Sequence, residues 1–189
     1  MIPSHQQLIG TLAHAEPQFL AGRFATGFIK AAGVEGEAGS FRYFPGGYWD
    51  VTLDGGTRFL SAPWGVRTEL ESGEVEEASG RGPIPPGGLP GPSCCHGTRR
   101  SWAGNMTTGR WDASRPILEE PGTLSVALMS LEDPSCTGTL TVSTGTYTIS
   151  KVDLRYMVQI LAVARTELNA EDLKVLDVIR SRVRKPPNV

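Results

Sequence analysis

The chain has 189 residues, of which 39% are hydrophobic and 20% are charged, and its formal net charge is −2. This length suits one domain with a substantial core, and the composition excludes a disordered chain and a protein built as a whole to bind a polyanion. The longest apolar run, near Val126 to Met129, is far shorter than the roughly 20 residues of a membrane-spanning helix, and the N-terminus MIPSHQQLIGTLAHA lacks the pattern of a secretory signal, so we expect a cytoplasmic protein with no membrane span.

The first element in chain order is predicted to be a helix over residues 17–32, PQFLAGRFATGFIKAA. Pro17 suits a first helical turn. Gly22 and Gly27 oppose the helix by about 1 kcal/mol each relative to alanine. The apolar residues that recur near helical spacing are Phe19, Leu20, Phe24, Phe28 and Ile29.

Between Ser40 and Glu77 the hydrophobic period changes to two, which is typical of strands. In YWDVTL, Trp49, Val51 and Leu53 alternate with more polar residues. Turn residues follow at 54–56, at 62–65 and at 72–73. This stretch therefore predicts a meander of about three or four antiparallel strands.

Two segments of the meander resemble strands of periplasmic lipoprotein-carrier domains. They are FRYFPGGYWDV, residues 41–51, and APWGVRTEL, residues 62–70. The resemblance implies a curved antiparallel sheet that holds an apolar ligand between the sheet and its helices, and it carries over no site residue. One hypothesis for the function is therefore a small-molecule or lipid carrier.

A Pro/Gly-rich loop or arm is predicted at about 79–120, within a single domain that spans 1–189. Residues 79–92, SGRGPIPPGGLPGP, can continue neither a strand nor a helix. Residues 93–120 are irregular in pattern, and Trp102 and Trp111 within them are expected to anchor the segment to the body of the protein.

The C-terminal part predicts strands at 123–129, 139–142 and 146–149, followed by a pair of helices. Ser150 is the expected N-cap of the first helix and Asn169 that of the second, and Pro186-Pro187 ends the second. The residues expected on the apolar faces of the two helices are Leu154, Met157, Val158, Leu161 and Ala164, then Leu173, Leu176, Ile179 and Val183. The predicted fold class is α+β: an antiparallel β-meander or sheet, with an N-terminal helix and a C-terminal helix pair packed on it.

Cys94, Cys95 and His96, in PSCCHGTRRSW, are the candidate metal ligands, with Cys136 as a fourth. Paired zinc cysteines are separated by two to four residues so that both thiolates can reach one ion, whereas these three residues are consecutive. An odd number of cysteines, two of them adjacent, is also unlike a disulfide framework. We therefore expect reduced thiols, no bound metal and no cofactor.

A thiol-dependent enzyme that uses Cys94 or Cys95 with His96 is an alternative hypothesis. Arg99 and Arg100 would lower the pKa of a nearby thiol, but no third group is placed to orient the histidine. The sequence also lacks the familiar nucleotide-binding, hydrolase and metalloprotease motifs. The balance of these features favours a protein that is not an enzyme.

Charge is distributed unevenly, with an acidic strip at residues 69–77 followed by arginines that alternate with tryptophans. This composition is found in single-stranded nucleic-acid binders, which are a further alternative. It fits association with itself or with another protein at least as well. The leading hypothesis is a non-enzymatic interaction or assembly protein, homo-oligomeric or part of a larger particle such as a virion or phage. Its predicted contact surface consists of Arg99, Arg100, Trp102, Arg110 and Trp111.

Overall fold

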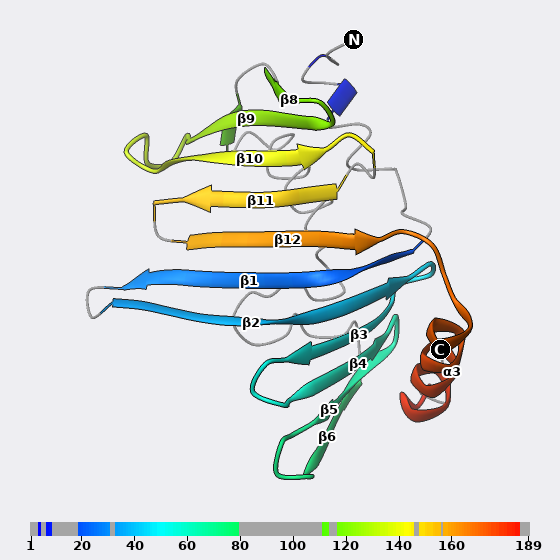
Figure 1. Ribbon diagram of the computed structural model, residues 1–189. Helices are drawn as coiled ribbons and strands as arrows, with labels where there is room; N and C mark the ends of the chain where they lie inside the picture. The colour runs from blue at the N-terminus through cyan, green and yellow to red at the C-terminus, as the bar shows by residue number, and fades with distance from the viewer. Residues whose placement is uncertain are drawn as a thin grey trace.

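The computed structural model describes residue 4 and residues 7–8, 19–30, 33–79, 111–113, 117–145, 148–155 and 157–185. These residues form a 12-stranded antiparallel sheet with a helix at one end (Figure 1). The first six strands are β1 Leu20–Lys30, β2 Gly33–Phe44, β3 Tyr48–Leu53, β4 Arg58–Ala62, β5 Gly65–Glu69 and β6 Val75–Ser79. The remaining elements are β7 Trp111–Ala113, β8 Ile117–Glu120, β9 Thr123–Ser130, β10 Thr137–Ser143, β11 Thr148–Leu154, β12 Met157–Arg165 and α3 Ala170–Arg182.

The sheet is continuous because β1 pairs with β12 and so joins the two halves of the chain. The strand order is β6-β5-β4-β3-β2-β1-β12-β11-β10-β9-β7, and β8 also pairs with β9. In the register between β1 and β12, Phe24 lies opposite Leu161 and Thr26 lies opposite Gln159. Figure 1 shows β1, near the start of the chain, lying beside β12, near its end.

The predicted N-terminal helix over 17–32 is wrong, because residues 20–30 form strand β1. Side chains alternate between the two faces of a strand, so Leu20, Phe24 and Thr26 point to one face while Ala21 and Arg23 point to the other. Apolar residues four positions apart, such as Leu20 and Phe24, satisfy both a helical period and a period of two. Pairing with β2 and β12 selects the strand, and the spacing of apolar residues in the sequence does not reveal this pairing.

The first helix of the predicted C-terminal pair is also wrong, since the segment after Ser150 forms the β11–β12 hairpin. Leu154 and Leu161, assigned above to one helical face, instead lie on one face of the sheet with Val152. The α+β prediction with an N-terminal helix and a C-terminal helix pair is thus corrected to a large antiparallel sheet with one helix at the C-terminal end of the described chain.

The second predicted helix is confirmed as α3, and its N-cap is Asn169. The Asn169 side chain accepts a hydrogen bond from the Asp172 backbone N–H at 2.9 Å, and the Asp172 carboxylate accepts one from the Asn169 backbone N–H at 2.9 Å. This reciprocal capping box satisfies two backbone donors that the first turn of a helix otherwise leaves unpaired.

The predicted meander is confirmed as strands β3 to β6, which follow one another as antiparallel neighbours. Of the predicted loop or arm at about 79–120, residues 80–110 lie outside the described residues. Near its end, β7 and β8 pair with β9 where the sequence predicted an irregular segment.

The two faces of the sheet bury different sets of side chains. On the face here called the helix face, α3 packs over β3 and β4. The buried residues there are Phe19, Ala21, Phe44, Leu60, Ala62, Ile179 and Val183. The opposite face, here called the apolar face, buries Leu20, Phe24, Phe41, Tyr43, Trp49, Val51, Phe59, Val66 and Leu161, followed by Leu124, Val126, Leu128, Leu140, Val142, Ile149, Val152 and Leu154. In the part of the chain that the structure describes, no helix is long and apolar enough to cross a membrane.

Candidate ligand-binding face

The apolar face continues across the junction between β1 and β12. Leu161 lies opposite Phe24, and one row further along Val152 of β11 lies opposite Gln159. Among the described residues outside the sheet, Leu8 alone belongs to the two clusters of this face, and α3 lies on the helix face. The two clusters of the apolar face thus draw side chains from nine consecutive strands in the sheet order, from β5 to β9.

At its middle the apolar face has a position without a side chain, Gly39 of β2. Gly39 lies opposite Phe24 on one side and opposite Leu53 on the other. A Cβ at Gly39 would come within 2.9 Å of Phe24 Cζ, closer than real Cβ contacts. The phenyl ring therefore lies across the glycine, and this gap in the row of side chains is filled from the neighbouring strand.

Two cross-strand pairs on the apolar face carry buried polar atoms that lack a hydrogen-bond partner. One pair is Thr26 with Glu37, and the other is Trp49 with Ser61. The atoms are Thr26 Oγ1, Glu37 Oε2, Trp49 Nε1 and Ser61 Oγ. A buried polar group without a partner costs about 1–3 kcal/mol, so such groups are rare in folded proteins. Within the part of the chain that the structure describes, these four atoms are the buried side-chain atoms without a hydrogen-bond partner, and they are therefore candidates for contact with a ligand.

The Trp49 side of this arrangement is held firmly by aromatic packing. The Trp49 ring makes an edge-on contact with Tyr43 at 4.9 Å between centroids and a tilted contact with Phe41 at 6.3 Å. Trp49 is 0% exposed and Ser61 is 1% exposed. The indole N–H and the Ser61 hydroxyl thus belong to buried side chains that lie opposite each other on neighbouring strands.

The helix face presents a different chemistry, a network of ion pairs beside α3. Arg42 Nη1 and Arg58 Nε donate to the two oxygens of Asp50 at 3.0 and 2.7 Å. Arg165 donates to both oxygens of Asp172. A cleft of about 230 Å³ lies between these groups over β1 to β3. Because its cations already meet carboxylates, we assign this network to the docking of α3 and not to ligand binding.

Hydrogen bonds from arginines lower the pKa values of two carboxyl groups, Asp172 of the network and Glu69 on β5. Hydrogen bonds from Arg165 lower the pKa of Asp172. Burial alone would raise the pKa of Glu69, but hydrogen bonds from Arg67 and Arg182 outweigh burial, and the pKa is lowered. Both carboxylates are therefore held in the charged form by the fold.

A consequence is a loss of stability in acid. Groups whose pKa is lower in the folded chain stabilise it fully above their unfolded pKa, which is about 4, and lose that contribution as the pH falls through the folded value. We expect the urea midpoint to be constant between pH 7 and about pH 5 and to fall below about pH 4. Urea titrations across this range check the expectation, and a midpoint that rises in acid would contradict it.

Most of the sequence-predicted site residues lie outside the described residues: Cys94, Cys95, His96, Arg99, Arg100, Trp102 and Arg110. The backbone of Trp111 is placed in β7. Cys136 is a partly buried free cysteine in the β9–β10 turn, where its backbone bonds to Asp133 and Ser130. The described ranges hold no group of three metal-ligating side chains. The thiol-enzyme, metal and contact-surface hypotheses therefore stay untested.

Sequence reasoning missed the two polar pairs of the apolar face. The alternation in β3 correctly placed Trp49 beside Val51 on one face. Nothing in the sequence marked its partner Ser61, which lies in the neighbouring strand. Thr26 was not assigned to this face because residues 17–32 were predicted to be helical. A period-of-two interpretation of residues 20–30 would have placed Thr26 on the same face as Phe24.

Comparisons with known proteins find neither a family nor a curated relative: no family model and no curated protein matches the chain. Among solved structures, the chain is similar to a domain from Vibrio parahaemolyticus that is named for outer membrane lipoprotein sorting. The similarity covers 93% of this chain and 96% of that one, with 9% sequence identity and a TM-score of 0.34.

Proposed function

We propose that the protein is a carrier that binds an amphipathic molecule with a hydrocarbon chain, such as a lipid, against the apolar face of its sheet. The observation that carries the proposal is the combination of a broad apolar face with four buried polar atoms that lack partners on that face. Apolar surface binds the chain through the hydrophobic effect, and the polar atoms bind the polar parts of the ligand.

The spacing of the two polar pairs fits a chain of lipid length. Trp49 lies opposite Tyr43 of β2, and Glu37 lies six residues earlier on the same strand. At about 3.3 Å per residue this separation is roughly 20 Å. One lipid chain spans half of the roughly 30 Å hydrocarbon core of a bilayer, so it fits between the pairs. Phe41 and Gly39, with the Phe24 ring across the glycine, lie between the pairs.

The chemistry of each pair suggests what it recognises. The Trp49 indole can only donate a hydrogen bond, and the Ser61 hydroxyl can donate as well, so this pair suits an acceptor such as an ester or carboxyl oxygen. The Thr26 hydroxyl and the free oxygen of Glu37 suit a group that donates, such as a hydroxyl or an amide. A ligand with a polar group at each end of an apolar part satisfies both pairs.

Thr26→Val tests the proposal, because valine keeps the shape of threonine and removes the unpaired hydroxyl. We expect the free energy of unfolding of the ligand-free protein to rise by about 1 kcal/mol. We expect the affinity for a fluorescent fatty acid to fall about fivefold, through the loss of one hydrogen bond. Urea unfolding and probe titration measure the two effects.

The control for this variant is Thr139→Val on β10, since Thr139 lies opposite Asp153 and Ala127 on the helix face. It makes the same chemical change away from the proposed site and is expected to leave probe binding unchanged. If Thr26→Val also leaves probe binding unchanged, Thr26 does not contact the ligand and the assignment of this polar pair is wrong.

A further inference from the structure

A group of aromatic and basic side chains lies where the β2–β3 and β4–β5 turns meet the end of α3. This group, here called the basic end, consists of Tyr48, Trp64, Arg180, Arg184 and Lys185. The rings of Tyr48 and Trp64 meet edge to face, with centroids 5.7 Å apart. The indole N–H of Trp64 donates to the carbonyl oxygen of Val183 at 3.1 Å, which ties the turn to the chain after α3.

Cations lie against both rings of the basic end. The Arg180 guanidinium carbon is 5.3 Å from the centroid of the Tyr48 ring, and Lys185 Nζ is 5.9 Å from that of the Trp64 ring. Both distances are in the range of cation–π attraction. Membrane proteins commonly place Trp and Tyr, together with Lys and Arg, at the level of the lipid headgroups.

Two arginines next to the basic end are neutralised within the protein, since Arg67 pairs with Glu69 and Glu77, and Arg182 pairs with Glu69. Within the described ranges, neither Arg184 nor Lys185 forms an ion pair with a carboxylate, and both are exposed. Two cations are therefore available to an anionic partner, although the chain as a whole has a net charge of −2.

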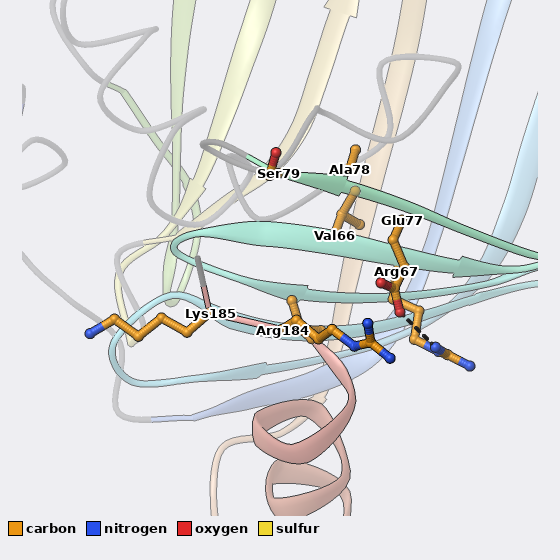
Figure 2. A pocket seen from close by; sticks show the side chains of 8 residues that line it. Val66, Arg67, Glu77, Ala78, Ser79, Arg184 and Lys185 are labelled. Atoms are coloured by element: carbon orange, nitrogen blue, oxygen red, sulfur yellow. Dashed lines mark hydrogen bonds and ion pairs between the residues drawn. The ribbon is translucent and has the colours of Figure 1, made fainter. Parts of the chain in front are cut away.

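Beside these two cations lies a pocket of about 450 Å³ at the edge of the sheet (Figure 2). Val66, Ala78 and Val183 contribute apolar surface to its lining. Figure 2 shows Arg184 and Lys185 extending from the chain after α3, and the paired Arg67 and Glu77 on the adjacent strands. An anionic group joined to hydrocarbon, as in a phospholipid, matches this combination.

We propose that the basic end docks the protein onto an anionic phospholipid surface, with Arg184 and Lys185 contacting lipid phosphates. This inference rests on the proposed function, since a lipid carrier must meet a membrane to take up or release its ligand. Electrostatic attraction of basic residues to anionic headgroups supplies the affinity, and the half-buried Tyr48 and Trp64 sit at the depth of the headgroups.

The test is cosedimentation of the full chain with vesicles of phosphatidylcholine alone and with added phosphatidylglycerol. We expect binding to the anionic vesicles only, and weakening as salt is added. The double variant Arg184→Gln with Lys185→Gln should bind about thirty-fold more weakly. The matched control, Lys151→Gln with Arg155→Gln, removes the same charge from β11 and the turn after it, and should bind like the unaltered protein.

Equal binding to neutral and anionic vesicles, or an equal loss in the control variant, would overturn the docking proposal. Binding to polyglutamate without binding to vesicles would also overturn it and would make the basic end a site for acidic proteins. Fluorescent fatty acid binding is measured on the same samples. The Arg184 and Lys185 variant should keep that binding, so a failure of docking and a failure of the carrier function give different results.

Discussion

Replacing Asp172 with alanine is expected to lower the free energy of unfolding by about 3 kcal/mol and to detach α3 from the sheet. The Asp172 carboxylate accepts two hydrogen bonds from Arg165 and one from the Asn169 backbone. It also lies 3.3 Å from Arg42 Nε. The change removes a helix cap and leaves two guanidinium groups without this partner, and both effects act on the same helix.

Urea unfolding followed by circular dichroism measures this loss. Asp177→Ala is the control, because Asp177 is exposed on the same helix, and it should change stability by less than about 0.5 kcal/mol. Asp172→Asn keeps the size of the side chain and removes its charge, so its loss of stability should lie between the losses for Asp172→Ala and Asp177→Ala. A loss below about 1 kcal/mol for Asp172→Ala would show that the ion-pair network does not hold α3 in place.

Trp49→Ala is expected to be the most damaging change on the apolar face, at about 3–5 kcal/mol, since it removes a fully buried indole packed on Phe41 and Tyr43. Trp49→Phe separates packing from hydrogen bonding. It retains an aromatic ring but removes the unpaired N–H, so the cavity left by the smaller ring is partly offset and the loss of stability should be much smaller than for Trp49→Ala. Its affinity for the fluorescent fatty acid should fall about fivefold or more.

Trp64→Phe is the matched control for Trp49→Phe, because it also removes one indole N–H. That N–H donates to Val183 within the protein. Stability should therefore fall by about 1 kcal/mol while fatty acid affinity stays unchanged. If the two variants behave alike in both assays, the Trp49 N–H has no ligand partner and the proposed recognition by the Trp49–Ser61 pair is incorrect.

The parts of the fold that the sequence predicted correctly are those set by local signals. Glycine-containing turns at 54–56 and 72–73 and the alternation around Trp49 predicted the meander. Asn169 marked the start of α3, because its side chain bonds to backbone three residues ahead.

The wrong predictions depend on contacts between distant segments. Residues 20–30 and 157–165 pair with each other across more than half of the chain, and no local signal reports that pairing. Their apolar residues recur at intervals that fit a helix as well as a strand. For the same reason the candidate site was not predicted: Trp49 with Ser61 and Thr26 with Glu37 become neighbours only through strand register.

The central claim is that the apolar face carries a lipid-like ligand, and native mass spectrometry of the purified, untagged protein tests it most directly. The account predicts a species heavier than the chain by the mass of a bound amphipathic molecule, which is lost on extraction with organic solvent and replaced on incubation with a fatty acid. A bare chain that takes up no fatty acid under the same conditions would contradict it.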